Sequence, residues 1–173
     1  MPNPTTSRNL VRLAYTLIAG LTFFADQFTK SLIEHRIGLY EVVPVIPHFF
    51  NLTHSQNPGA AFGLFSDSPS LWKTILLIVV SALMIGAVLA IAWRSPRLDW
   101  KTGAGLALIM GGALSNLSDR IRFGRVTDFL DVYYRSYHWY TFNVADSAIV
   151  IGAFLLIAKV GFADGSAAAK THD

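Results

Sequence analysis

Two carboxylates flank the start of the last long apolar stretch in this chain of 173 residues. Asp128 precedes the stretch, and Asp146 lies among its first residues, in the sequence FNVADS. A chain that turns back at this point could bring the two side chains together. Because adjacent carboxylates cannot both ionise cheaply, they would share a proton and supply one general base and one general acid. Such a pair suits hydrolysis, in which the base activates a water and the acid protonates a departing amine.

Other catalytic chemistries have little support in the composition. There is no cysteine, which excludes disulfides, thiolate metal sites and thiol redox chemistry. The five histidines show no His-x-x-x-His spacing, and no Gly-x-Ser-x-Gly sequence occurs. We therefore expect neither a metal nor another cofactor. The net charge is only +3 and the basic residues are scattered, so nucleic acid is not an expected partner.

The segments that would position the two carboxylates are strongly apolar. Hydrophobic residues make up 53% of the chain and charged residues 14%, against about a quarter charged in soluble domains. A membrane-crossing helix needs about 20 mostly apolar residues. Four stretches qualify, at residues 13–33, 72–93, 102–120 and 142–162. We expect a single all-α membrane domain over residues 1–173 with four transmembrane helices and a flexible tail from about residue 164.

The first apolar stretch is interpreted as a retained helix, not as a cleaved signal peptide. Although Arg8 and Arg12 precede it, the apolar segment continues past Asp26 and no small-x-small cleavage site follows. With four crossings, the long connections 34–71 and 121–141 must lie on one side of the membrane and both termini on the other. Lys and Arg are equally frequent on the two sides, so only the arginines before the first stretch favour cytoplasmic termini.

Polar residues from three of the predicted spans fall at one depth. Asp26 is late in the first span, Asn116 and Arg120 are late in the third, and Asn143 and Asp146 are early in the fourth. All five therefore approach the side that carries the long connections. An ionisable residue costs about 2.5–3.5 kcal/mol at the centre of a membrane helix. Their convergence on one layer indicates a polar site.

The third span has a helical face that would support such a site. Gly112, Asn116 and Arg120 are four residues apart, so they stack on one face, where the glycine would let another backbone approach. We expect Asp119 to form a local ion pair with Arg120. Asp131, three residues after Asp128, is expected to be a solvated loop acid.

Two pairs of these residues also have a purely local interpretation. Asp26 and Lys30 are four residues apart in a helical pattern and could neutralise each other. Asn143 and Asp146 match an N-cap residue followed by an acid at the third helical position. Neither interpretation excludes a role in a site.

The first long connection predicts two short strands. They cover Tyr40–Ile46 and Phe49–Thr53, and Pro44 makes the first an edge strand or a bulge. An isolated pair of strands is unstable in water, so it must lie on the membrane surface or against the other long connection. The sequence NPGAAFG, at residues 57–63, predicts a turn followed by one or two helical turns. The second connection is rich in aromatic residues, which suit the headgroup region.

The residue chemistry leaves two functional classes open. A hydrolase would use the carboxylate pair, whereas a small transporter would use Asp26 and Asp146 to carry a coupled proton or ion. Transporters are expected to place such groups near mid-membrane and often show inverted repeats, and neither feature is present here. A non-catalytic assembly protein would not explain why three helices contribute polar residues to one layer.

Four motifs give the chain a resemblance to a known family. DQFTK (26–30), NPGAAFG (57–63), GGALSNLSDRIRFGRVTDFLD (111–131) and FNVADS (142–147) occur in the family's order over nearly the whole chain. With them the chain resembles bacterial lipoprotein signal peptidase, or signal peptidase II. The resemblance implies an aspartyl endopeptidase of the bacterial cytoplasmic (inner) membrane, multi-pass, with cytoplasmic termini. Its active site and small β-containing loop region would face outward.

The resemblance also implies the substrate and the site residues. The family removes the signal peptide from diacylglyceryl-modified prolipoproteins, just before the lipidated cysteine, so such prolipoproteins and membrane lipid are the expected partners. Its catalytic aspartates correspond to Asp128 and Asp146. The supporting and substrate-binding positions correspond to Asp26, Lys30, Asn57, Gly59, Gly112, Asn116, Arg120, Asn143 and Ala145. Globomycin-type inhibitors are expected to bind the same groove. Pro58 stands where the family often has a small polar residue.

Overall fold

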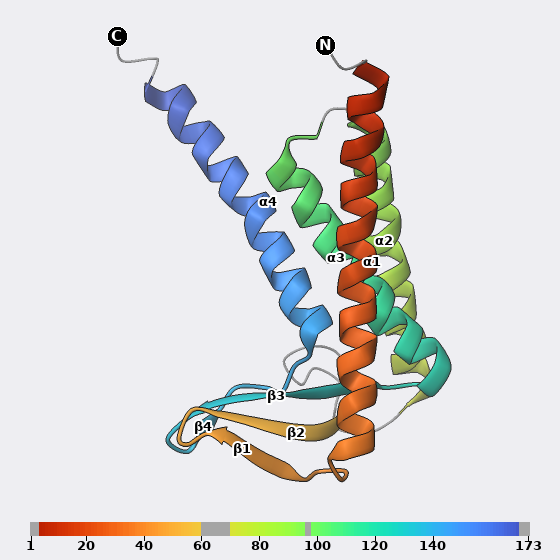
Figure 1. Ribbon diagram of the computed structural model, residues 1–173, viewed down its shortest axis with the longest axis vertical. Coiled ribbons are helices and arrows are strands. Elements are labelled where there is room, and N and C mark those ends of the chain that lie inside the picture. The colour runs from red at the N-terminus through yellow and green to blue at the C-terminus, as the bar shows by residue number, and fades with distance from the viewer. Residues whose placement is uncertain (1–3, 60–69, 96–97, 170–173) are drawn as a thin grey trace.

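The computed structural model describes residues 4–59, 70–95 and 98–169. Within them, a small antiparallel sheet lies at one end of four helices (Figure 1). The helices are α1 (Pro4–Arg36), α2 (Leu71–Arg94), α3 (Trp100–Phe123) and α4 (Val144–Ala169). The strands are β1 (Val42–Ile46), β2 (Phe50–Asn57), β3 (Val126–Tyr134) and β4 (Tyr137–His138), and they lie in this order.

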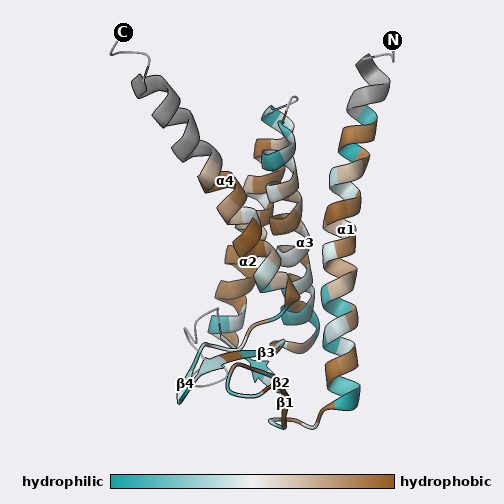
Figure 2. Cartoon of the chain, turned by 60° about the vertical axis from the view of Figure 1, so that its left-hand side comes forward, coloured by the Kyte–Doolittle hydropathy of each residue, from teal (hydrophilic) through white to brown (hydrophobic). Residues whose placement is uncertain are grey.

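The first three predicted spans lie within helices, and the fourth, predicted from residue 142, begins two residues before α4; the four helices differ in apolarity. In the described part of the chain, only α2 is both long and apolar enough to cross a membrane by composition. A shorter apolar helix covers Val144–Ala158. Hydrophilic residues interrupt α1 and α3 where these helices approach the sheet (Figure 2). The number of membrane crossings therefore stays a prediction.

Helix α3 is the centre of the helical part, since it packs against α1, α2 and α4. Glycines on α3 make two of these contacts close. A Cβ atom on Gly112 would lie 2.5 Å from the carbonyl oxygen of Ala145 in α4. A Cβ atom on the preceding Gly111 would collide with the carbonyl oxygen of Ala19 in α1. The prediction that Gly112 admits another backbone is confirmed.

The sheet joins the two long connections. β1 is an edge strand whose pairing with β2 shifts register between Pro44 and Ile46, as the proline predicted. β2 continues to Asn57, four residues beyond the predicted end at Thr53, because it also pairs with β3. The strand pair therefore lies against the second connection, one of the two expected arrangements. β3 itself was not predicted.

The ends of the helices match the expected arrangement of the connections. The sheet lies at one end of the molecule, whereas α1 begins and α4 ends at the opposite end (Figure 1). Helix α3 ends at Phe123, and the next residue, Gly124, has a left-handed backbone with φ of 70°. Helix α4 continues to Ala169, so part of the expected tail is helical. The short helical piece expected after Gly59 lies outside the described residues.

Candidate active site

Asp128 and Asp146 are brought together by the return of the chain beside β3. Phe142 pairs with Leu130 through an N–H···O bond of 3.1 Å, with the return bond from the Leu130 N–H at 2.8 Å. This bridge places the next residue, Asn143, beside Asp128. The Nδ2 of Asn143 donates to the Oδ1 of Asp128 at 2.7 Å. Helix α4 starts at once, and its first turn carries Asp146.

Asn143 and Asp146 form a reciprocal helix cap. The backbone N–H of Asp146 donates to Oδ1 of Asn143 at 2.9 Å, and the N–H of Asn143 donates to Oδ2 of Asp146 at 3.4 Å. These bonds satisfy N–H groups that a helix start leaves without intrahelical partners. The predicted cap is confirmed, and the same asparagine contacts the other carboxylate.

Two asparagine amides donate to Asp128, and their orientation follows from their other contacts. An amide Oδ1 only accepts and an Nδ2 only donates. The Oδ1 of Asn143 is held by the N–H of Asp146, and the Oδ1 of Asn57 accepts from the N–H of Gly59 at 2.8 Å. Each Nδ2 must therefore point the other way. The Nδ2 of Asn57 donates to Oδ2 of Asp128 at 2.8 Å.

A third amide, that of Asn116 on α3, donates to the other carboxylate. Its Nδ2 lies 2.8 Å from Oδ1 of Asp146. Its Oδ1 accepts from Nζ of Lys30 at 2.8 Å and lies 3.4 Å from Nδ2 of Asn143. Because an ammonium group has only donors, Lys30 fixes the orientation of this amide. All three amide NH₂ groups thus face the carboxylates.

Lys30 is the centre of a buried ionic cluster between α1 and α3. Its Nζ lies 2.6 Å from Oδ2 of Asp26 and 2.6 Å from Oδ2 of Asp119. The local pair with Asp26 is therefore confirmed. The predicted pair of Asp119 with Arg120 is wrong in the described structure, since Asp119 binds Lys30. Neighbouring residues of a helix do not face each other, which explains the difference.

Asp26 holds the start of α4 in place. Its side chain is completely buried and accepts from the backbone N–H of Ala145 at 2.8 Å and from Oγ of Ser115 at 2.7 Å. Ala145 is also completely buried, and its carbonyl oxygen faces Gly112. Ala145 therefore supports the site through its backbone and packing.

Sequence reasoning missed two members of this cluster. Gln27 donates through Nε2 to Oδ1 of Asp119 at 2.6 Å and to Oγ of Ser115 at 2.9 Å. The helical spacing could have indicated both residues. Ser115 and Asp119 are four residues apart, and Gln27 and Lys30 are three apart, so each pair shares one helical face.

Arg120 connects α3 to the turn that follows β2. Its Nη2 donates to the carbonyl oxygen of Gly59 at 3.2 Å, and its Nη1 donates to the carbonyl oxygen of Asn116 at 3.3 Å. Gly59 in turn orients Asn57, as described above. Arg120 therefore supports the turn from which one amide reaches Asp128.

Asp131 belongs to a separate cluster, and the prediction that it is solvated is wrong. It is buried, accepts from Nδ2 of Asn51 at 2.8 Å and lies 2.8 Å from Nδ1 of His138. Strand pairing explains this, because Asn51 is its direct partner on β2. Side chains alternate along a strand, so the odd spacing puts Asp131 on the face opposite Asp128.

The environment of Asp128 favours its protonated form. Burial and then the nearby charge of Asp146 raise the pKa of Asp128 to about 7, although the amides of Asn57 and Asn143 and the charge of Lys30 act in the opposite direction. The carboxyl therefore keeps a proton to near neutral pH. Within the described residues, no group of three or more His, Asp or Glu side chains is arranged to hold a metal ion.

The predicted site residues lie together at the sheet end of the helices. The structure links the dyad to all nine supporting positions through the contacts above, from α1, the turn after β2, α3 and the start of α4. The predicted layer of polar residues is therefore present. The chemical role of each residue stays a prediction.

Comparison with known proteins gives concordant results. The family model of Signal peptidase (SPase) II matches residues 18–162. The lipoprotein signal peptidase of Solibacter usitatus is 50% identical over 140 residues, covering 81% of this chain and 85% of the relative. That of Syntrophus aciditrophicus is 43% identical over 145 residues, covering 84% and 90%. A bacterial membrane enzyme solved by the in meso method at 2.3 Å matches with a TM-score of 0.77 and 31% identity, covering 85% of this chain and 87% of that chain.

Proposed function

This chain belongs to the signal peptidase II family of aspartic proteases, and we propose that it uses Asp128 and Asp146 as its catalytic dyad. Its substrates would be diacylglyceryl-modified prolipoproteins, cleaved just before the lipidated cysteine. One observation carries the proposal. The buried carboxylate of Asp128 and the partly buried carboxylate of Asp146 share a layer of amide donors, and groups that can only donate orient the amides toward them. Such an arrangement keeps the dyad in place and restricts its protonation states.

The contacts favour a division of roles within the dyad. We assign the shared proton to Asp128, whose pKa of about 7 keeps it protonated up to neutral pH. Asp146 lies in the first turn of α4, where the helix dipole favours negative charge, and it accepts a bond from Asn116. Asp146 is therefore the better base.

The reaction then needs only these two groups and water. Asp146 accepts a proton from the water, whose oxygen attacks the scissile carbonyl carbon. The tetrahedral intermediate collapses as the C–N bond breaks, and Asp128 gives its proton to the departing amine nitrogen. The proton held by Asp146 returns to Asp128, which restores the starting state.

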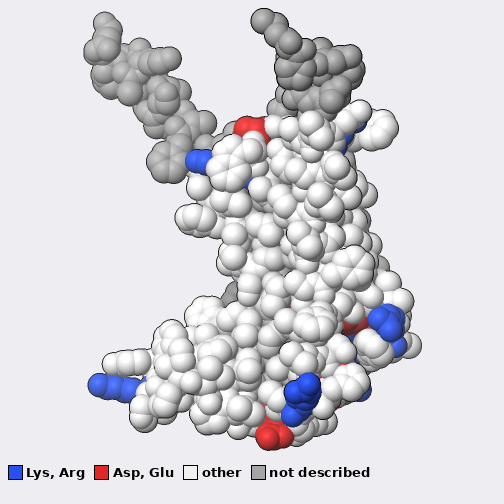
Figure 3. Space-filling model, viewed as in Figure 1, with Lys and Arg blue, Asp and Glu red and all other residues white. Residues whose placement is uncertain are grey.

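A topology of four crossings with cytoplasmic termini fits the surface of the molecule. Charged side chains gather at the two ends, and an uncharged band lies between them (Figure 3). The charges that lower the apolarity of α1, at Asp26 and Lys30, are buried against α3, whereas Leu21, Phe24 and Phe28 are exposed. Helix α1 can therefore present an apolar surface to lipid. In this topology the dyad lies toward the outer face of the membrane.

This depth suits a lipid-anchored substrate. The acyl chains of a prolipoprotein can stay in the bilayer while its peptide bond reaches the layer that holds the dyad. A transporter is less consistent with the geometry, because the polar groups gather at the sheet end of the helices (Figure 2).

The deciding experiment is cleavage of a defined diacylglyceryl-modified prolipoprotein by the purified enzyme in micelles, with an unlipidated copy as control. We expect cleavage of the lipidated substrate alone, at the bond before the cysteine, and inhibition by globomycin. Equal cleavage of both substrates would contradict the proposed substrate class. Ion flux in liposomes that depends on Asp26, without proteolysis, would support the transporter instead.

A further inference from the structure

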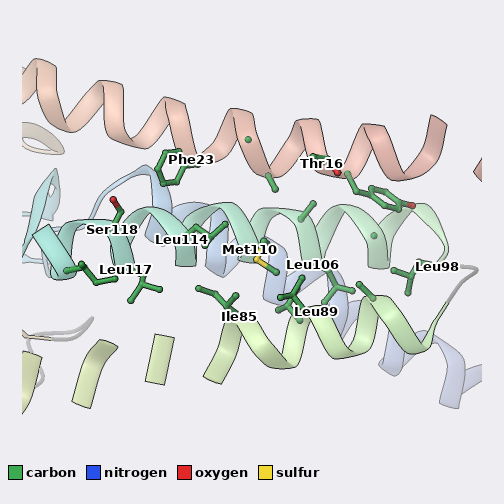
Figure 4. A pocket seen from close by; sticks show the side chains of 18 of the residues that line it. Thr16, Phe23, Ile85, Leu89, Leu98, Leu106, Met110, Leu114, Leu117 and Ser118 are labelled. Carbon is green, nitrogen blue, oxygen red and sulfur yellow. The ribbon is translucent and has the colours of Figure 1, made fainter. Parts of the chain in front are cut away.

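A long apolar groove lies on the side of α3 away from the dyad. Its volume is about 890 Å³, and side chains from α1, α2 and α3 line it (Figure 4). Among them, Phe23, Leu89 and Met110 lie between the three helices. The α3 positions that line the groove do not include Asn116 or Arg120, so its walls are separate from the active site.

The length of the groove is close to the thickness of the hydrocarbon core of a lipid bilayer. On α3 its lining runs from Gly103 to Arg122, which corresponds to about 28 Å of helix at about 1.5 Å per residue. The hydrocarbon core of a bilayer is about 30 Å thick. In the proposed topology the groove therefore faces acyl chains along its whole length.

The two ends of the groove are chemically different. At the end away from the sheet, the ring of Tyr15 packs onto Gly103, and its hydroxyl donates to the carbonyl oxygen of Asp99 at 3.4 Å. This contact ties α1 to the start of α3 at that end of the groove. At the sheet end, the exposed Arg122 lines the groove, at the depth of the outer headgroups in the proposed topology.

We propose that this groove binds one phospholipid, with an acyl chain between α1 and α2 and the phosphate on Arg122. The apolar lining of the groove suits an acyl chain. The guanidinium of Arg122 at the sheet end complements a phosphate, which it binds through charge-assisted hydrogen bonds. The proposal depends on the membrane placement of these helices but not on the catalytic dyad.

A transmembrane peptide fits the groove less well. A helix is about 10–12 Å wide with its side chains and needs a wider seat than a single acyl chain. An apolar helix would also offer Arg122 no phosphate to bind. For these reasons we favour a lipid over a second copy of the chain or the signal segment of a substrate.

The structure offers a matched pair of variants that test occupancy. A Cβ atom on Gly20 meets nothing within 4 Å, and Gly20 lines the groove. A Cβ atom on Gly86 of α2 also meets nothing within 4 Å, but Gly86 does not line it. Gly20→Phe should therefore fill the groove, whereas Gly86→Phe adds the same ring elsewhere on the helices.

The measurement is native mass spectrometry of the purified protein with added phosphatidylglycerol or added dioleoylglycerol, which lacks phosphate. We expect one bound phosphatidylglycerol on the wild type and on Gly86→Phe, and loss of that lipid from Gly20→Phe. Arg122→Gln should weaken phosphatidylglycerol binding about tenfold or more without changing dioleoylglycerol binding. Arg125→Gln, at an exposed position outside the groove, is the matched control.

Several outcomes would overturn the proposal. Equal phosphatidylglycerol binding by Gly20→Phe and Gly86→Phe would show that the lipid sits elsewhere. Equal effects of Arg122→Gln and Arg125→Gln on phosphatidylglycerol binding would contradict the proposed contact between Arg122 and the phosphate. A photoreactive residue at Leu89, which lines the groove, should capture lipid; capture of a prolipoprotein or a second copy would instead make the groove a peptide site. None of these results depends on proteolysis, so the proposed function is tested separately.

Discussion

Nζ of Lys30 donates to Oδ1 of Asn116 at 2.8 Å, and this contact determines which end of the amide meets Asp146. Without the ammonium group, the amide could rotate and present an oxygen to a carboxylate. Among the described residues, Lys30 forms no hydrogen bond or ion pair with either member of the dyad; its partners are Asp26, Asn116 and Asp119. It therefore acts on the dyad as a positioning residue, through Asn116, and also through its charge, which lowers the pKa of Asp128.

Replacing Lys30 should cost both stability and activity. Lys30→Met leaves the buried carboxylates of Asp26 and Asp119 without their cation, and breaking a buried pair in this way costs about 3–5 kcal/mol. We expect a clear fall in the thermal unfolding temperature of the purified protein in micelles. Arg36→Met, at an exposed position on the same helix, should change little. Equal effects of the two changes would show that the cluster does not stabilise the fold.

Each member of the dyad should be indispensable. Asp128→Asn and Asp146→Asn preserve the size of the side chain but remove the group that exchanges a proton. General acid–base catalysis contributes roughly 10²–10⁴-fold, so we expect a loss of at least this size in cleavage of a lipidated prolipoprotein. The unfolding temperature should stay close to that of the wild type. Normal turnover by either purified variant would exclude that residue from the dyad.

Asn116→Ala should weaken catalysis less than loss of an aspartate. The change removes the acceptor of Lys30 and the hydrogen bond to Asp146; the bond to Asp146 is worth about 1.5–3 kcal/mol, so turnover should fall roughly 10- to 150-fold. The same cleavage assay measures it. A loss as large as that of Asp146→Asn would give Asn116 a direct chemical role.

Activity should decline above about pH 7. The pKa of Asp128 in the folded protein lies near 7, above its ordinary value of 3.8, so the acid keeps its proton below this pH and loses it above. The value of kcat/KM should then fall about tenfold per pH unit. Asn57→Ala removes a donor that stabilises the charged carboxylate, so it should move the decline to higher pH.

Asn51→Ala is the control for this pH profile. Asn51 makes a comparable bond of 2.8 Å to Asp131, in the cluster separate from the dyad. The pH at which activity declines should therefore not change. An equal shift in both variants would indicate a general loosening of the sheet and would contradict the assignment of the proton to Asp128.

The close contact of α3 with α4 can be tested at one position. Gly112→Ala places a Cβ atom 2.5 Å from the carbonyl oxygen of Ala145, and the first turn of α4 must shift to relieve the clash. Overpacking of this kind costs about 1–3 kcal/mol. We expect lower stability and lower cleavage, because the same turn carries Asp146. Gly86→Ala, where nothing lies within 4 Å, is the control that should leave both unchanged.

The gathering of the polar residues at one end of the helices and the helix cap could be predicted from the sequence, because both depend on local features. Alternating spans bring Asp26, Asn116 and Asp146 to one side whatever the packing. Capping depends on two residues three positions apart, Asn143 and Asp146. These parts of the site follow from residue counts and helical periodicity.

The partners of individual charges could not be predicted, because they depend on which helix faces and strands meet. Lys30 and Asp119 are 89 residues apart, and Asn51 and Asp131 are 80 apart. From the local pattern we predicted that Asp119 pairs with Arg120 and that Asp131 is solvated. In the structure, tertiary packing gives both aspartates other partners. β3 was missed for the same reason, since its pairing with β2 joins two separate connections.

The position of Lys30 one turn after Asp26 has a consequence for biosynthesis. In the proposed topology α1 enters the membrane before α3 and α4 have been made. The distant partners of Asp26, at Ser115 and Ala145, are then still absent, but the ammonium group is already 2.6 Å away on the same helix. The nascent helix can thus carry its own counter-ion into lipid. Asp26 and Lys30 therefore enter the membrane as a neutral ion pair. Their remaining hydrogen-bond partners join them when α3 and α4 are inserted.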